Sequence, residues 1–249
     1  MIRPPRLLAL LAAMALPAAA LAATAFTTAV ADPGRPAADT ARDADRKPAA
    51  MLAFAKVKPG ETIVDYIPGR GYFTRLFSAA VGPRGTVYAA TPQLLIDRMT
   101  KAGFPLPPSV TTEPGRGNVR DVIVSGGSFH IPVRVDLVWT AQNYHDVHIG
   151  VGPTGAEYLD KVVFDLLKPG GYYVVVDHAG APGLDEAGTK ALHRIDEDVV
   201  KKEVLAAGFV LDSESKILHN PADPHTAAVF DPSIRGHTDQ FALRFRKPG

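Results

Sequence analysis

The chain has 249 residues, of which 46% are apolar, so it is long enough to form one domain with a sizeable hydrophobic core. It contains no cysteine, which excludes disulfides and a lipid-attached thiol, so the core alone must stabilise the fold. Its 27 basic and 26 acidic residues are scattered rather than clustered, and this balance argues against a nucleic-acid partner. The composition indicates no other macromolecular partner and leaves the oligomeric state open.

The first 31 residues have the pattern of a secretory signal. Arg3 and Arg6 precede an uncharged, apolar stretch that runs to Ala31, and the small residues Ala29-Val30-Ala31 predict cleavage after Ala31. Ala20-Leu21-Ala22 is an earlier alternative. An uncleaved anchor is the competing interpretation, because the 25 uncharged residues are enough to span a bilayer. We expect residues 1–31 to be a signal peptide and the mature protein to be exported, periplasmic or extracellular, without membrane attachment.

Residues 32–46 show no apolar periodicity and predict a linker, so the folded domain is expected to span residues 47–249. A short helix over residues 48–57 precedes an alternation of strand-like and helix-like segments. This alternation is typical of an α/β fold with a largely parallel sheet covered on both faces. The expected strands are residues 62–67, 86–90, 119–124, 133–139, 172–176, 209–218 and 240–245.

Four helices are expected between these strands. Two cover residues 72–81 and 93–101. The third begins at the capping-box spacing of Thr154 and Glu157, and the fourth is marked by the apolar residues Leu192, Ile195, Val199 and Leu205. His193, Asp196 and Glu197 are expected on the solvated face of that last helix. Residues 219–238 form a long loop, either a lid or a surface excursion.

The segment from Ile63 to Thr74 is the most informative part of the chain. A β-branched run ends at Asp65 and passes through Gly69 and Gly71 into an amphipathic helix. In an α/β fold this junction lies at the carboxyl end of a strand, where ligands bind. Glycines let the backbone approach a ligand closely, and free N–H groups at the helix start favour polar or anionic atoms.

This segment resembles the first motif of class I S-adenosylmethionine-dependent methyltransferases, an acidic residue followed by glycines at alternate positions. Asp65, Gly69 and Gly71 match, while Ile67 stands at the first glycine. Residues 81–89, 166–171 and 207–209 are also similar to turns of that family. The resemblance covers about residues 47–248 and implies a Rossmann-like seven-stranded methyltransferase sheet, mostly parallel with an antiparallel last strand.

Within that family the chain most resembles a group of exported, predicted methyltransferases of unassigned substrate, through residues 46–48, 68–74 and 238–241. The resemblance implies S-adenosylmethionine as cofactor and an unidentified small molecule or envelope component as substrate. The carboxylates that the family carries after its second and third strands are replaced by Thr91 and Ser125. The residues implied in cofactor binding are Asp65, Pro68, Gly69, Arg70, Gly71, Tyr72, Thr91 and Ser125.

Polar residues follow the fourth and fifth expected strands, over residues 142–148 and at Asp177-His178. Both segments fall at the carboxyl ends of neighbouring strands and should converge over the glycine loop. We expect His145 to act as a general base, oriented by Asp146 or Asp177. Asn143 and Tyr144 would position the substrate. The alternative is a hydrogen-bond network without a catalytic part.

Two further interpretations remain open. Asp177-His178 stands where catechol-type O-methyltransferases place an Asp-Asn pair, and His145, Asp146 and His148 would complete a metal site. The Asp expected at the end of the fourth strand is absent, so no metal is assigned. The alternatives to a methyltransferase are a non-catalytic ligand-binding protein with a methyltransferase fold, or a metal-assisted enzyme.

Overall fold

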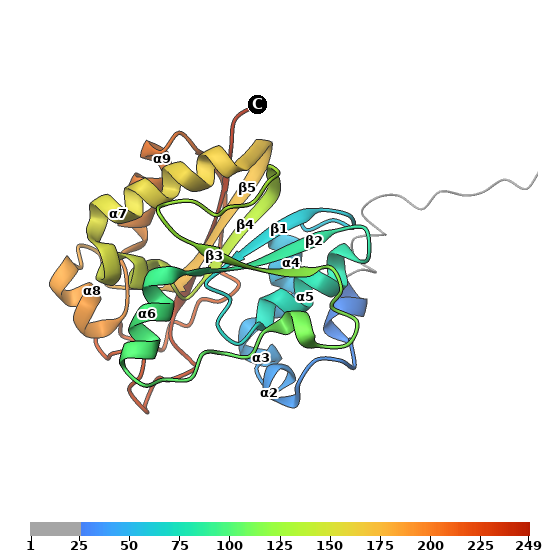
Figure 1. Ribbon diagram of the computed structural model, residues 1–249. Helices are drawn as coiled ribbons and strands as arrows, with labels where there is room; N and C mark the ends of the chain where they lie inside the picture. The colour runs from blue at the N-terminus through green and yellow to red at the C-terminus, as the bar shows by residue number, and fades with distance from the viewer. Residues whose placement is uncertain (1–25) are drawn as a thin grey trace, which may run out of the picture.

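The computed structural model describes residues 26–249, which form a three-layer α/β domain around one sheet (Figure 1). The sheet has seven strands in the order β3-β2-β1-β4-β5-β7-β6. All neighbouring pairs from β3 to β5 are parallel, while β7 is antiparallel to both β5 and β6. This confirms the expected fold class. The strands are β1 Thr62–Tyr66, β2 Thr86–Pro92, β3 Val119–Val124, β4 Val135–Ala141, β5 Leu167–His178, β6 Val210–Ser215 and β7 Gln240–Arg246.

The sheet separates two hydrophobic clusters, because successive side chains of each buried strand point to opposite faces. On one face Trp139 packs at 4.5 Å and 5.5 Å, centroid to centroid, on Phe73 and Phe77 of α5 (Tyr72–Val81). On the other face Tyr173 and its neighbours pack under α7 (Tyr144–Leu166) and α9 (Glu197–Ala206). In Figure 1, α7 and α9 accordingly lie on the opposite side of the sheet from α4 and α5.

The remaining helices are short. They are α2 Ala37–Thr40, α3 Asp43–Arg46, α4 Pro48–Phe54, α6 Gln93–Lys101, the 3-10 turn η1 Val110–Thr112 and α8 Glu186–Leu192. Within residues 26–249 no helix is both long and apolar enough to span a bilayer.

Two helices differ from the sequence-based expectation. The helix expected from Thr154 is present, but across a kink at Gly152 (φ 72°) before Pro153 it is joined to a further helical segment that begins at Tyr144, and both make up α7. The single helix expected around Leu192 and Ile195 is two helices, because His193 adopts a left-handed backbone (φ 54°) and Ile195 forms a β-bridge with Ala179. Apolar spacing alone does not reveal such a break, since the periodicity resumes after it.

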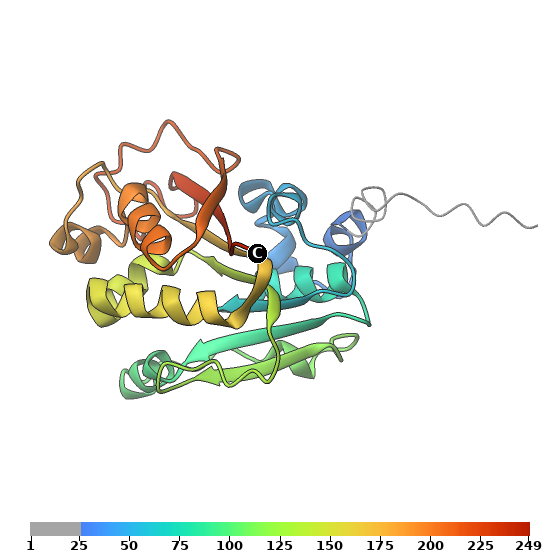
Figure 2. The ribbon, with the colours of Figure 1, turned by 90° about the horizontal axis from the view of Figure 1, so that it is seen from above.

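The expectation of a linker over residues 32–46 is wrong. This segment folds as α2 and α3 and lies against α5 (Figure 2). Its charged side chains, which suggested a solvated linker, make ion pairs within the domain. The pairs are Asp32–Arg116 at 2.5 Å, Arg35–Asp43 at 2.5 Å and Asp39–Arg75 at 2.9 Å.

Residues 26–30, inside the expected signal peptide, also pack on the domain. They are helical, Ala29 is fully buried, and Phe26 and Val30 contact the core cluster that contains Phe77. Nη1 of Arg35 donates a hydrogen bond to the carbonyl of Val30 at 2.8 Å. Cleavage after Ala31 would remove these contacts, whereas cleavage after Ala22 would keep them.

We therefore expect a chain beginning at Ala23 to be more stable than one beginning at Asp32. The difference in free energy of unfolding should be about 2 kcal/mol, the value of burying one or two apolar side chains. Denaturant unfolding of both chains measures it, and if a leader is removed, N-terminal sequencing of the processed protein should start at Ala23. Equal stability of the two chains would contradict the expectation.

Candidate functional site

The loop between β1 and α5 holds three residues at positive φ in close succession: Ile67 (56°), Gly69 (57°) and Gly71 (82°). At Gly71 a Cβ would lie 2.3 Å from Cγ2 of Val110, so both the backbone and the space require glycine. At Gly69 a Cβ would meet nothing within 4 Å. The loop therefore turns its backbone toward an open space at Gly69 and packs tightly at Gly71.

Ile67 carries the glycine-like conformation without being a glycine. A β-branched residue in the left-handed region is a true outlier and costs about 1–2 kcal/mol. Hydrogen bonds to both backbone groups of Ile67 stabilise this conformation. The N–H of Ile67 donates to the carbonyl of Ala90 at 2.8 Å, and the Asn143 amide donates to the carbonyl of Ile67 at 3.0 Å. Strain of this kind is typical of functional sites.

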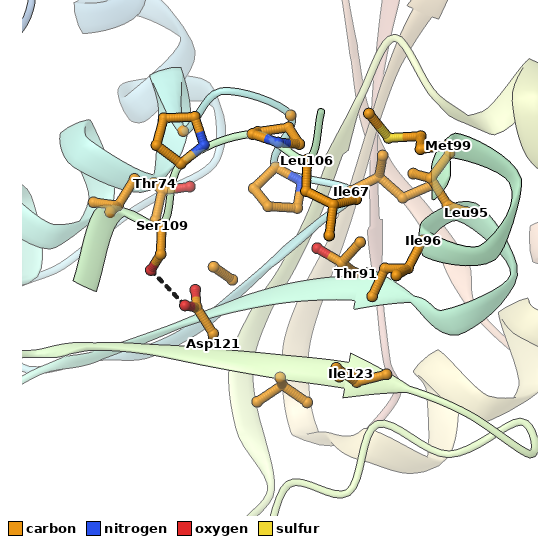
Figure 3. A pocket seen from close by; sticks show the side chains of 18 residues that line it. Ile67, Thr74, Thr91, Leu95, Ile96, Met99, Leu106, Ser109, Asp121 and Ile123 are labelled. Carbon is orange, nitrogen blue, oxygen red and sulfur yellow. Dashed lines mark hydrogen bonds between the residues drawn. The ribbon is translucent and has the colours of Figure 1, made fainter. Parts of the chain in front are cut away.

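A first cavity of about 350 Å³ lies on one side of this loop, between α6 and the ends of β2 and β3 (Figure 3). Most of its lining is apolar, with Leu95, Ile96 and Met99 contributed by α6. Its polar groups include Thr91 and Asp121, and Oγ of Ser109 donates a hydrogen bond to Asp121 (Figure 3). An apolar cavity with a few convergent polar groups is the usual form of a small-molecule site.

The sequence pattern does not single out Asp121, because the family's carboxylates are expected after the strands and not within them. It lies within β3, opposite Ala89 of β2, and supplies the carboxylate that Thr91 does not. The sequence does contain a sign of its role, because Asp121 is the one acidic residue of the strand-like run over residues 119–124. Ser125, expected to contact the cofactor, lines neither cavity. It bridges Ser128, and its hydroxyl lies 3.0 Å from Nε2 of His130.

A second cavity of about 380 Å³ lies on the other side of the loop, under α2 and α3. Ile67, Pro68 and Gly69 line both cavities, so only the loop separates them. The second lining is more polar than the first. It includes Asp39, Arg42, Arg46, Asp65, Arg70, Tyr72, Gln142 and Asn143.

Arg46 is the central cation of the second cavity. Its guanidinium lies 4.6 Å from the ring centroid of Tyr72 and donates one hydrogen bond, at 2.8 Å, to Oε1 of Gln142. Nε of Arg46 is buried without a hydrogen-bond partner among residues 26–249. Burial and the neighbouring Arg42 lower the pKa of Arg46 to about 10. A positive charge with spare donors faces this cavity.

Asp65 is the anion beside it. Its side chain is 3% exposed, and Oδ2 accepts a hydrogen bond from the hydroxyl of Thr74 at 2.6 Å. Burial raises the pKa of Asp65 to about 7, against the opposing effects of the Thr74 hydroxyl and the charge of Arg46. A cation bound in the second cavity would favour the ionised carboxylate.

Of the four residues expected to act on the substrate, Asn143 is the one that lines either of these two cavities. Tyr144 is fully buried and points into the core under α7, where its hydroxyl lies 2.7 Å from Asp160 and 2.9 Å from Glu203. Tyr144 is the first residue of α7, and its side chain belongs to the core cluster under α7 and α9 and lines neither cavity. His148 pairs with the same Glu203 at 2.8 Å.

His145 is 2% exposed and lines neither cavity. Its Nδ1 lies 2.7 Å from Oδ1 of Asp177, and its backbone N–H donates to Oδ2 of Asp177, also at 2.7 Å. The orienting role expected of Asp177 is thus present in the geometry. Burial opposes the charged imidazole, but the Asp177 carboxylate outweighs it and raises the pKa of His145. The pKa of Asp177 is lowered, because the charge of His145 and hydrogen bonds overcome the effect of burial.

The neighbouring His178 behaves in the opposite way. Burial lowers the pKa of His178 to about 4, so its ring is neutral near neutral pH. Nδ1 of His178 lies 2.7 Å from the hydroxyl of Thr238. His193, expected on a solvated face, turns inward instead, with its ring 5.5 Å from that of His145. Asp196 caps α9 by accepting from the N–H of Asp198 at 2.9 Å.

The loop over residues 219–238 is held to the domain. Arg194 and Asp223 form an ion pair of 2.8 Å in which both side chains are fully buried. Asp223 also accepts from the backbone N–H groups of His225 and Asp239. This fits the expectation of a surface excursion better than that of a free lid.

No family model matches the chain, and no curated protein matches it. Solved structures do. An S-adenosylmethionine-dependent methyltransferase from Mesorhizobium loti is 16% identical, with a TM-score of 0.52 over 83% of this chain and 100% of that one. The CcbJ methyltransferase from Streptomyces caelestis is 12% identical, with a TM-score of 0.52 over 80% of this chain and 88% of that one. The chain therefore has the fold of class I methyltransferases, with the seven-stranded sheet expected from the sequence.

Proposed function

We propose that the protein is an S-adenosylmethionine-dependent methyltransferase that binds its cofactor across the glycine loop. The observation that carries this proposal is the pair of cavities on the two sides of the loop, which share Ile67, Pro68 and Gly69. The loop follows β1 at the point where the strand order reverses between β1 and β4, and doubly wound sheets bind ligands at such a point. An apolar cavity next to a charged one suits a ligand with an adenosine and an amino-acid end.

The residues present fit that ligand. The first cavity offers apolar contacts from α6 for a base, and the Asp121 carboxylate and Thr91 hydroxyl for ribose hydroxyls. The second offers the spare donors of Arg46 for a carboxylate and the Asp65 carboxylate for an ammonium group. Gly69, with open space over its Cα, lets the ligand pass close to the backbone.

The cofactor supplies a methyl group that its sulfonium already activates, so the protein's part is to bind and align. Asn143 holds the loop by its hydrogen bonds to Ile67 and Ala141, and thereby positions the boundary between the two cavities. We propose a small molecule or an envelope component as the substrate and, because of the N-terminal leader, a place of action outside the cytoplasm. His145 as general base remains a prediction that its burial does not favour.

The test is a calorimetric titration of the protein, expressed from its full-length sequence, with S-adenosylmethionine and S-adenosylhomocysteine. The native protein should bind both saturably. Gly69→Asp should reduce the affinity at least 100-fold, because its side chain occupies the space between loop and ligand. Gly60→Asp is the matched control, since Gly60 also has positive φ (84°) and open space but precedes β1 at the other end of the strand.

With Gly60→Asp we expect unchanged affinity, so a loss confined to Gly69→Asp would support the cleft as the cofactor site. Absence of binding in the native protein at millimolar ligand would overturn the proposal. So would equal weakening by both substitutions.

A second function is favoured by Ile67 and His145. The Ile67 side chain stands between the two cavities at the place of a glycine, and the expected base lies outside both. These features suit a non-catalytic protein that binds another ligand with a methyltransferase fold. One experiment distinguishes the two functions. Radiolabel transfer from methyl-labelled cofactor into an envelope extract, abolished by Gly69→Asp and retained by Gly60→Asp, would exclude the non-catalytic one.

A further inference from the structure

A cluster of two histidines and one carboxylate lies where the first turn of α7, with His145 and Asp146, meets His193 at the end of α8. Nε2 of His145 lies 3.5 Å from Oδ1 of Asp146, and Nδ1 of His193 lies 3.3 Å from the same oxygen. The three ligand atoms are all within 4.8 Å of one another. Around a tetrahedral zinc ion with bonds of about 2.0–2.1 Å, ligand atoms are separated by roughly 3.3–3.4 Å. The observed separations from Asp146 match this spacing.

The ring of His145 is held in the orientation that a metal ligand needs. Its Nδ1 and backbone N–H both bind the fully buried carboxylate of Asp177, each at 2.7 Å. With Nδ1 occupied in this way, Nε2 is the nitrogen that faces Asp146 and His193. Metal-bound histidines almost always have such a carboxylate or carbonyl partner on the second nitrogen.

His193 supplies an independent observation. Its Nδ1 is buried and, although it lies 3.3 Å from Oδ1 of Asp146, it makes no hydrogen bond among the described residues. Its backbone is held in the left-handed region (φ 54°), and its ring packs edge-on to Phe230 at 4.9 Å. A strained residue that directs a buried nitrogen without a hydrogen bond at two other ligand atoms is typical of a binding site rather than of a solvated helix end.

We propose that His145, Asp146 and His193 bind a divalent transition metal ion of the zinc type, with Asp177 as the residue that orients His145. Two imidazoles and one carboxylate suit zinc, and three protein ligands leave a fourth position open, as in catalytic zinc sites. The Asp146 side chain is 48% exposed, so the open position faces solvent. The site is separate from the glycine-loop cavities and does not depend on the proposed cofactor.

The experiment measures zinc and cobalt binding to the protein expressed from its full-length sequence and stripped of metal with a chelator. We expect one zinc ion per chain by elemental analysis after dialysis. Cobalt should give the intense visible absorption of four-coordinate Co²⁺, and zinc should displace it. Zinc should also raise the melting temperature in a concentration-dependent way, because a ligand that binds only the native state stabilises it.

Variants show whether the metal binds at this cluster or at other histidines. Asp146→Ala and His193→Asn should each abolish the cobalt absorption, and asparagine is chosen at position 193 because it tolerates a left-handed backbone. Asp177→Asn should weaken zinc binding by roughly 10–100-fold, as for an orienting carboxylate. His219→Ala is the control, since His219 pairs with Asp239 at 2.9 Å but lies outside the cluster, and it should leave binding unchanged.

Less than one zinc ion per chain at saturation, or the weak absorption of six-coordinate cobalt, would overturn the proposed site. The same holds if Asp146→Ala binds zinc as tightly as the native protein. Because Asp146 is an exposed residue, its variant should fold even if the substitution at the strained position 193 does not.

Discussion

Asp65→Asn is expected to remove a pH dependence of stability of about 4 kcal/mol. The pKa of Asp65 is about 7 in the folded protein because the carboxyl is buried, against 3.8 for an ordinary aspartate. Below pH 4 both states are protonated and Asp65 contributes nothing. Between pH 4 and pH 7 the unfolded chain releases a proton that the native state keeps, so stability falls as pH rises. The two pKa values differ by 3.2 (7 − 3.8), so ionisation of Asp65 lowers the free energy of unfolding by about 4 kcal/mol. This destabilisation is complete above pH 7.

Urea unfolding of the native protein and of Asp65→Asn from pH 4 to pH 8 measures this effect. The two free energies of unfolding should agree near pH 4 and diverge above it, with the variant the more stable at pH 8. Asp165→Asn, at an exposed position, controls for the loss of one negative charge and should follow the native protein. Parallel profiles for all three proteins would contradict the raised pKa.

The same substitution should have the opposite effect on binding. On the proposed function, Asp65 presents its carboxylate to a cationic ligand, so Asp65→Asn should weaken S-adenosylmethionine binding by at least tenfold at pH 8. Stability that rises while binding falls is the usual relation for a buried charge kept at a functional site.

Arg194→Met is expected to lower the free energy of unfolding by about 3–5 kcal/mol, because it leaves the buried carboxylate of Asp223 without its cation. Arg194 is fully buried and also donates to the carbonyls of Ala179 and Ala227, both at 2.9 Å. These bonds join the end of β5 to the loop over residues 219–238. We therefore also expect this loop to become the first site of limited proteolysis.

Two variants make the Arg194 prediction specific. Arg235→Met, at an exposed arginine of the same loop, should change stability by no more than about 0.5 kcal/mol. The double variant Arg194→Met with Asp223→Asn should recover part of the loss, because the unpaired charge is then removed. A loss below 1 kcal/mol for Arg194→Met would mean that the loop is held by other contacts.

The fold could be predicted because its signals are local and repeated. The apolar runs of β1, β4 and β5, the glycines after β1 and the turn before β5 each restrict the backbone over a few residues. Their order along the chain is compatible with few topologies. Helix α6 was predicted to the residue, as was β3, since each is bounded by turn-forming residues. The glycine loop was placed correctly at the carboxyl edge of β1 for the same reason.

The site depended on contacts between distant segments, which no local pattern contains. Tyr144 follows Asn143 directly, yet the helix that begins there turns one side chain into the core and leaves the other on the cleft. His193 reaches Asp146 only because the chain breaks between α8 and α9. The charges of Asp32, Asp39 and Asp43 suggest a solvated linker in the sequence. In the structure each of these residues forms an ion pair with an arginine.

The amino-acid sequence was therefore sufficient for the strands, for the glycine loop and, through the family resemblance, for the mostly parallel sheet, because backbone preferences and apolar periodicity act over short distances. The tertiary structure decided which polar side chains meet: Asp121 in the first cavity, Arg46 and Asp65 in the second, and the histidine cluster beyond them. Side-chain direction at a helix start, ion pairing and burial are set by packing across the whole domain, and a charge shows its role only when its partner is known.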